Sequence, residues 1–135
     1  MNGRFQITMH ILTLLGMAGS ELLSSEYIAG SVNTNPALIR KELSNLREFG
    51  LIISREGKGG GYALSKPAEL IKLSDVYQSV KKEDILGHAK NLPNPKCTVG
   101  KQINGHLDAL YKEAEDAILM KLGGITLAAF CKQFQ

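Results

Sequence analysis

The chain has 135 residues, with 16 basic and 13 acidic side chains, and so carries a formal net charge of +3. This length fits one compact domain, or a small domain with an appendage, and excludes a multidomain enzyme. Hydrophobic residues make up 44% and charged residues 21%, which predicts a cored globular protein rather than a disordered chain, and +3 permits nucleic acid as a partner without requiring it.

The first predicted element is a helix from Arg4 to Met17. Its apolar residues follow one another at steps of four, three and three, as on one face of an amphipathic helix: Phe5, Met9, Leu12 and Leu15. Polar residues interrupt this stretch at helical spacing, which favours a helix of a cytoplasmic protein over an export signal. The chain has no run of 18 apolar residues, so no membrane span is predicted.

Two short helices joined by a polar turn are predicted next. A hydroxyl at Ser24 or Ser25 indicates the start of the second helix, which continues to Val32. The third helix is predicted over Pro36–Phe49, because proline suits the first helical position and Gly50 suits the C-terminal cap. Its inner face carries Ile39, Leu43 and Leu46, and its outer face carries Arg40, Lys41, Asn45 and Arg47. This pattern is typical of a helix-turn-helix DNA-binding unit, and it also occurs in helical hairpins that serve only packing.

A β-hairpin is predicted directly after the third helix. The β-prone run 51–54 and the returning run 62–64 flank a glycine-rich turn over residues 55–61. A hairpin in this place is a wing, whose glycines let the backbone approach a phosphate chain while Arg55 and Lys58 supply charge. A flexible turn without a ligand is the alternative, and the glycine spacing matches none of the phosphate-binding motifs.

The net charge lies on this part of the chain. Residues 34–66 hold six basic and three acidic side chains, whereas the remainder holds ten of each. A basic recognition helix and wing beside a neutral remainder is the distribution expected of a part that meets phosphates and a part that packs or dimerises.

The second half of the chain is dominated by one long helix. Before it, Ser74 is predicted to cap a short helix that runs through Val80, and residues 81–96 form a charged, proline-containing loop. The long helix has about 25 residues and would be about 37 Å long, more than a small winged domain can cover. Its apolar stripe predicts pairing with a second copy, the alternative being that it folds back on its own domain. The Gly123-Gly124 pair ends it, and Thr126 caps a short terminal helix.

Five stretches together resemble the bacterial Rrf2 family of winged-helix regulators, which includes IscR, NsrR and CymR. They occur in the family's order along almost the whole chain: Gly3-Arg4-Phe5, Leu43-Ser44-Asn45-Leu46-Arg47, Gly57-Lys58-Gly59-Gly60-Gly61-Tyr62-Ala63-Leu64, Ile71-Lys72-Leu73-Ser74-Asp75-Val76 and Ile125-Thr126-Leu127. The stretch from Asn94 to Gly100 looks most like the YwnA-like branch. The resemblance implies a mainly α fold with a small β-hairpin wing, and DNA binding as a dimer.

The cysteines depart from part of the family. Members with an iron-sulfur cluster carry three cysteines between the short helix and the long helix, whereas this chain has only Cys97 there and Cys131 near its end. A cluster needs about four ligands, and the three histidines show no metal spacing, so no cofactor is expected. Two cysteines also cannot form a disulfide framework. Cys97 lies near a helix N-terminus, which favours a thiolate, so it is either an oxidant-sensing thiol or an inert small residue.

The sequence thus predicts a dimeric, sequence-specific transcriptional regulator, a repressor with a redox response through Cys97, that binds an inverted repeat of double-stranded DNA in the cytoplasm. The alternative is a thiol or metal sensor module that acts through protein contacts; no enzyme is predicted, because no catalytic motif is visible. Residues 1–80 are expected to form the DNA-binding domain, 81–97 a loop or sensor region, and 98–135 the dimerisation and terminal helices.

Two sets of residues are expected to carry this function. Arg40 is expected to read guanine, and Lys41, Arg55 and Lys58 to fix the phosphate register. The DNA-binding set is Thr34, Asn35, Ala37, Leu38, Arg40, Lys41, Asn45, Arg55, Lys58, Gly59, Gly60 and Tyr62. The dimer set is Ile103, Leu107, Leu110, Ala114 and Ala117.

Overall fold

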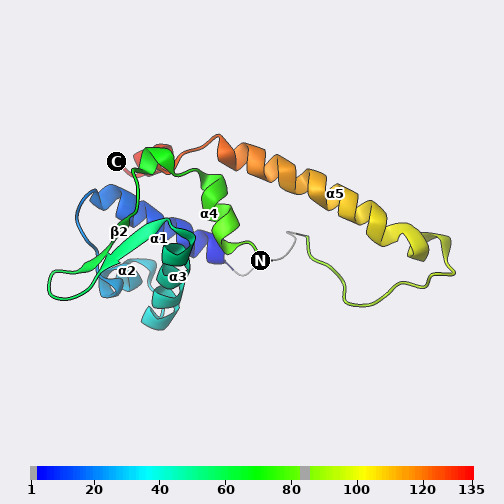
Figure 1. The fold of residues 1–135 in the computed structure, drawn as a ribbon, viewed down its shortest axis with the longest axis horizontal. Coiled ribbons are helices and arrows are strands. Elements are labelled where there is room, and N and C mark those ends of the chain that lie inside the picture. Colours follow the sequence, from blue (N-terminus) through cyan, green and yellow to red (C-terminus); the bar gives the residue numbers. More distant parts are fainter. Residues whose placement is uncertain (1–2, 83–85) are drawn as a thin grey trace.

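The computed structural model describes residues 3–82 and 86–135, so parts of the predicted first and sensor regions (1–2 and 83–85) lie outside the described residues. The predicted fold class is confirmed: the chain is mainly helical, with one two-stranded antiparallel hairpin and a long helix that projects from the body (Figure 1). The elements are α1 (Arg4–Ala18), α2 (Ser25–Val32), α3 (Pro36–Phe49), β1 (Ile52–Arg55), β2 (Gly61–Leu64), η1 (Ala68–Leu70), α4 (Leu73–Val80), α5 (Thr98–Gly123), α6 (Leu127–Cys131) and η2 (Lys132–Phe134).

Local capping explains the ends of the two helices of the helix-turn-helix unit. The Tyr27 N–H donates to the hydroxyl of Ser24 (3.1 Å) at the start of α2. At the start of α3 the Ala37 N–H donates to Oδ1 of Asn35 (2.7 Å). Gly50 ends α3 with φ of 90°, a left-handed conformation that favours glycine. These starts and this end confirm the predicted boundaries of α2 and α3.

The predicted cap of α4 was wrong. The helix begins at Leu73, so Ser74 lies inside it. The carboxylate of Asp75, two residues into the helix, accepts a hydrogen bond from the Lys72 N–H (3.0 Å). An acidic side chain in the first turn thus satisfies the backbone N–H of the residue before the helix, where a hydroxyl cap had been predicted.

The core joins the two ends of the chain. Its side chains with almost no exposed surface come from α1, α2, α3, β1, α4, α6 and the segments beside them: Ile11, Leu12, Leu15, Ile28, Ile39, Leu43, Leu46, Ile52, Ile71, Val76 and Leu127. The backbone N–H groups of Leu73 and Leu127 bond the carbonyls of Ile125 (2.9 Å) and Ile71 (2.8 Å). The terminal helix α6, which the predicted domain bounds group with the dimerisation helix in residues 98–135, packs into the core of the winged part, against α1.

One buried hydroxyl in α1 gives a test of this core. Thr8 is fully buried, and its hydroxyl has no hydrogen-bond partner among the described residues. Thr13 is also buried, but its hydroxyl donates to the Met9 carbonyl (2.7 Å). Thr8→Val replaces an unpaired polar group by a methyl group of similar size, so we expect the free energy of unfolding to rise by about 1 kcal/mol in urea denaturation. Thr13→Val is the matched control, and equal stabilisation by both variants would contradict this account.

The long helix α5 packs on the body only through its C-terminal half. It contacts α4 near its own C-terminal half, where Lys81 forms an ion pair with Glu115. Its N-terminal half points away from the winged part in Figure 1, and none of its residues is buried. The alternative that the long helix folds back on its own domain thus holds for its C-terminal half, and pairing of the remainder with a second copy stays a prediction. None of the helices in the described part of the chain combines the length and apolar character of a membrane span.

Candidate nucleic-acid interface

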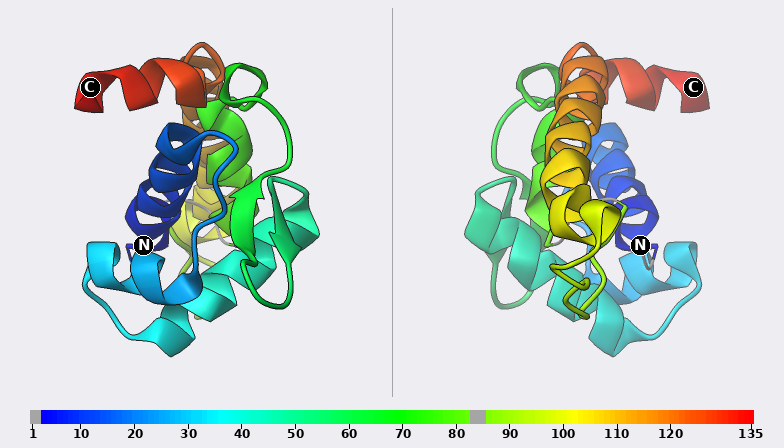
Figure 2. Two further views of the ribbon diagram at one scale, coloured as in Figure 1. Left: turned by 90° about the vertical axis from the view of Figure 1, so that its left-hand side faces the viewer. Right: turned by 90° about the vertical axis from the view of Figure 1, so that its right-hand side faces the viewer.

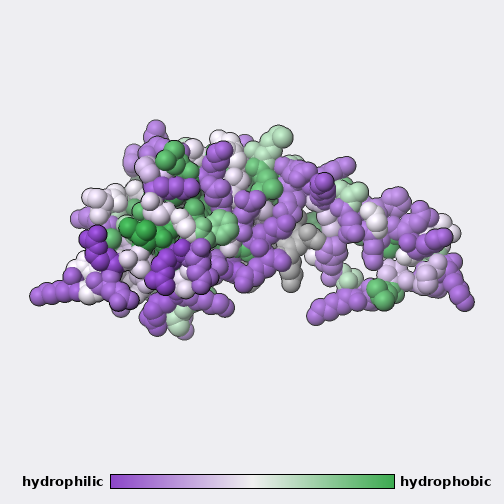
Figure 3. Space-filling view, viewed as in Figure 1, coloured by the Kyte–Doolittle hydropathy of each residue, from purple (hydrophilic) through white to green (hydrophobic). Residues whose placement is uncertain are grey.

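α2, α3 and the turn of the hairpin form one side of the molecule. They lie at the bottom of both views in Figure 2, and α6 lies at the top. Antiparallel pairing of β1 with β2, from Ile52↔Leu64 to Arg55↔Gly61, holds the turn beyond the ends of the strands. The turn is also hydrophilic in the space-filling view of Figure 3. A helix and a hairpin turn on the same side are the two parts that a winged helix-turn-helix unit applies to a duplex.

The start of α3 presents several of the predicted contact residues to solvent. Arg40 and Lys41 are exposed, as are Asn35 and Ala37, and the pair Thr34 and Leu38 is half-buried. Oδ1 of Asn35 is already engaged in the helix cap. The exposed basic side chains of this helix are therefore the groups best placed to reach a partner.

Asn45 was predicted to contact DNA, and the structure places its amide nitrogen against α4. Its side chain is half-buried, and Nδ2 donates to the carbonyl of Ser79 in α4 (2.9 Å). The amide is thus turned toward the body, where it links α3 to α4. Sequence spacing alone could not reveal this, because the partner lies 34 residues away.

The wing turn is shaped by its glycines. The Gly60 N–H donates to the Gly57 carbonyl (3.0 Å), and a Cβ atom on Gly60 would lie 2.1 Å from the carbonyl oxygen of Arg55. Only glycine fits that approach, so the tight turn accounts for Gly60 without any ligand. Gly59, Arg55 and Lys58 are exposed at the turn, and the two cations are free to face a phosphate chain.

Tyr62 lies at the base of the wing. Its N–H donates to the Leu23 carbonyl (2.8 Å), and its carbonyl accepts from the Leu23 N–H (3.0 Å). The half-buried side chain packs against the core. Pairing with the segment before α2 therefore holds the backbone of Tyr62 in place, and its contact with DNA stays a prediction.

The charge at this side is higher than the sequence count suggested. Glu42 is only 1% exposed and forms a two-point ion pair with Arg4 of α1, with N–O distances of 2.9 Å and 2.9 Å. Its charge therefore does not face solvent. Without Glu42, residues 34–66 hold six basic and two acidic side chains, all exposed, with a summed charge of +4. The signal for this pair was present in the sequence, since Glu42 occupies an inward position between Ile39 and Leu46, but the partner could not be read from it.

The two cysteines lie in opposite environments. Cys97 is exposed at the N-terminal end of α5, and hydrogen bonds from the backbone N–H groups of Gly100 and Val99 lower the pKa of its thiol. Cys131 is buried in α6, where burial raises the pKa of its thiol and Sγ lies 3.8 Å from the Thr13 carbonyl oxygen. Of the two, Cys97 is the accessible thiol and the one whose pKa is lowered.

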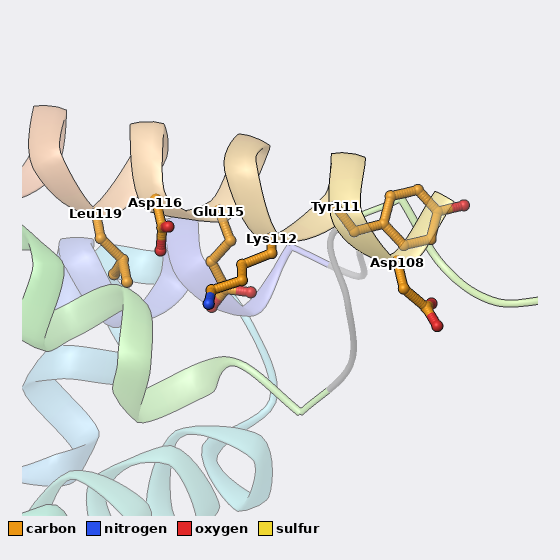
Figure 4. A pocket seen from close by; sticks show the side chains of 6 residues that line it. All are labelled: Asp108, Tyr111, Lys112, Glu115, Asp116 and Leu119. Carbon is orange, nitrogen blue, oxygen red and sulfur yellow. The ribbon is translucent and has the colours of Figure 1, made fainter. Parts of the chain in front are cut away.

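α5 has two distinct sides. One lines an open groove beside the body and carries Asp108, Lys112, Glu115 and Leu119 (Figure 4). The predicted dimer stripe lies about half a turn around the helix from this side, at 3.6 residues per turn. In the stripe Ile103 is 36% and Leu110 is 52% exposed, Ala117 is exposed, and Leu107 and Ala114 are half-buried. The stripe is thus partly covered: Ile103 and Leu107 line a pocket with residues between 86 and 93 of the preceding loop, whereas Leu110 and Ala117 face solvent.

The described residues do not assemble metal ligands. Within residues 3–82 and 86–135 no three side chains of His, Cys, Asp or Glu lie together as a metal site would require. His10 is paired with Ser31 (2.9 Å), and His88 packs edge-on against Tyr111 at a ring distance of 5.3 Å. The described residues therefore bring together fewer donors than the roughly four ligands of an iron-sulfur cluster.

Comparison with known proteins agrees with this architecture. Residues 1–133 match the family Rrf2, described as iron-dependent transcriptional regulators. The chain is 39% identical to the HTH-type transcriptional regulator YwnA of Bacillus subtilis. The identity is counted over 126 aligned residues, which make up 93% of this chain and 92% of the relative. Two solved structures share the fold: T. potens IscR (TM-score 0.73, 21% identity, 100% and 88% of the two chains) and CymR, the global cysteine regulator of B. subtilis (TM-score 0.73, 20%, 98% and 96%).

Proposed function

Because the chain belongs to the Rrf2 family of transcriptional regulators, we propose that it is a dimeric repressor that binds an inverted-repeat operator in the cytoplasm. In this proposal α3 enters the major groove, and the wing lies over the adjacent minor groove or backbone. The observation that supports it best is the exposed basic side formed by Arg40, Lys41, Arg55 and Lys58 on α3 and the wing. Arg40 reads a guanine in each half-site, and the other three fix the phosphate register.

The proposed division of labour follows the chain. Residues 1–80 bind DNA, 81–97 form the sensor region, and α5 within 98–135 dimerises, while α6 completes the core of the DNA-binding part. The stripe on α5 supports the dimer, because its apolar residues follow helical spacing and Ile103 and Leu110 remain exposed in the single chain, which suits pairing with an identical helix. The proposal gives the protein no catalytic role, in keeping with a family of regulators.

Selection of binding sites from genomic DNA with the purified protein tests the function. We expect an enriched inverted repeat whose half-site centres lie about one helical turn, or a multiple of it, apart. Binding that stays near nonspecific affinity, about 10⁻⁴ to 10⁻⁶ M, would instead favour a sensor module that acts through protein contacts.

Arg40 and Lys58 separate base contacts from phosphate contacts. Arg40→Ala is expected to relax the preference for one base pair in each half-site, a loss of about 1 to 3 kcal/mol of discrimination. Lys58→Ala is expected to weaken binding evenly across sequences and to reduce the salt slope by about 0.9 per protomer. Fluorescence anisotropy over a set of single-base variants of the duplex measures both effects. Lys132→Ala, at the opposite end of the molecule, is the control; a uniform loss with Arg40→Ala would contradict the base contact.

The proposal includes a redox response through Cys97. A peroxide oxidises the exposed thiolate to a sulfenic acid and is itself reduced to water. We expect hydrogen peroxide to lower operator affinity in the wild type and in Cys131→Ser, but not in Cys97→Ser. A thiol reductant should restore binding. A response that persists in Cys97→Ser would exclude this residue as the sensor.

We also propose that the protein carries no iron-sulfur cluster, although the family description names iron. The support is the donor set: one exposed cysteine at the start of α5, one cysteine buried in the core, and histidines engaged elsewhere. Protein purified without oxygen is expected to contain no stoichiometric iron or sulfide and no cluster absorption. A full complement of iron and sulfide would contradict the proposal.

A further inference from the structure

The buried side of the proposed recognition helix contains a charged group. Glu42 lies on α3 beside Ile39, Leu43 and Leu46, all of which have almost no exposed surface. The guanidinium of Arg4 reaches it from α1: Nε donates to Oε2 and Nη2 donates to Oε1, each at 2.9 Å. The side chains of Arg4 and Glu42 are only 18% and 2% exposed.

Such a pair is better suited to orientation than to stability. The cost of removing both charges from water offsets much of their attraction, so apolar residues of similar size often stabilise a fold as well. A two-point arginine–carboxylate contact, however, requires one relative orientation of the two planar groups. An apolar contact at the same place would tolerate sliding and rotation of the helix.

A second polar contact holds the same helix three residues further on. Nδ2 of Asn45 donates to the Ser79 carbonyl (2.9 Å), so side chains of α3 are bonded to both α1 and α4. Arg40 precedes Glu42 by two residues and lies on the opposite side of α3, about 200° around the helix. Any rotation of α3 permitted at Glu42 therefore changes the direction of Arg40 by the same angle.

We propose that Arg4 and Glu42 are positioning residues that fix the rotation of α3 about its axis, and thereby the fit of its side chains to one base sequence. This inference rests on the proposed DNA-binding function and adds residues that touch no DNA. The pair therefore raises the affinity for the specific sequence without raising the affinity for other sequences, because phosphate contacts tolerate small rotations of α3 that base contacts do not.

The test compares two duplexes: the one that the wild type selects and a scrambled duplex of the same composition. The main variant is Arg4→Met/Glu42→Leu, which removes the Glu42 carboxylate together with the guanidinium that pairs with it. We expect it to keep the wild-type affinity and salt slope on the scrambled duplex, and to lose affinity for the selected duplex by at least about tenfold, the scale of one base contact. Arg4→Lys keeps the charge but not the two-point geometry, and an intermediate loss is expected.

Thr8→Val is the control, because it changes the buried side of α1 one turn from Arg4 without touching the pair. If the double variant kept the wild-type ratio of affinities for the selected and the scrambled duplex, whether or not both affinities fell, the positioning role would be overturned. If the double variant did not fold, Arg4→Lys alone would decide in the same way. A wild type that selects no sequence would overturn the proposed function, and this inference with it.

Discussion

Leu110→Glu is expected to convert the protein into a monomer and to lower its affinity for the selected inverted repeat by about 10²- to 10⁴-fold. The first effect follows from the place of Leu110 in the exposed stripe of α5, where two facing glutamates would be buried against each other. The second follows because a dimer binds its second half-site as an intramolecular event, and a monomer loses that advantage. Since this side chain is 52% exposed in the single chain, the fold itself should tolerate the change.

Sedimentation and anisotropy measure the two effects together. Ala109→Glu is the matched control, since Ala109 is exposed on the same helix but lies about a third of a turn from both the stripe and the groove side. The variant Leu110→Glu should bind an isolated half-site like the wild type. A dimer that survives Leu110→Glu and still binds the full repeat would show that another surface forms the interface.

Most of the fold could be predicted because its signals are local. Asn35-Pro36 and Gly50 set the ends of α3 by their own conformations, and Thr126 caps α6 as expected, its hydroxyl accepting from the Ala129 N–H (3.0 Å). The errors arose where a distant partner decides. β2 begins at Gly61, one residue before the predicted run. The backbone of Tyr62 is hydrogen-bonded to that of Leu23, a pairing that the local sequence pattern does not predict.

The candidate interface likewise has residues that the local sequence predicts and residues whose role depends on a distant partner. The exposure of Arg40, Lys41 and Lys58 follows from helical periodicity and turn composition, both of which the sequence contains. The engagement of Asn45 depends on how α4 packs, and the partner of Glu42 lies 38 residues away. Hydrophobic spacing indicated which side of α3 faces inward. The role of the Glu42 carboxylate on that side, however, can be assigned only when its partner Arg4 is known.

The Arg4–Glu42 pair also carries the largest expected effect on stability. Arg4→Met leaves the Glu42 carboxylate in the core without its partner, so we expect the free energy of unfolding to fall by about 3 to 5 kcal/mol in urea denaturation. Glu42→Leu is expected to cost less, because the Arg4 side chain is 18% exposed and its guanidinium can turn toward water.

The double variant completes the cycle. In Arg4→Met/Glu42→Leu no charge is left in the core, so its stability should return to the wild-type value or exceed it by about 1 to 4 kcal/mol. All four proteins should be compared at one protein concentration, because dimerisation adds to apparent stability. If Arg4→Met cost less than about 1 kcal/mol, the contact would be no stronger than an exposed ion pair. A large cost that the double variant fails to recover would show that Arg4 stabilises the fold through contacts other than Glu42. If the double variant recovered its stability but lost operator discrimination, the role of the pair in stability would be separated from its role in orientation. The fold would then be intact, while the orientation of α3 would no longer be fixed.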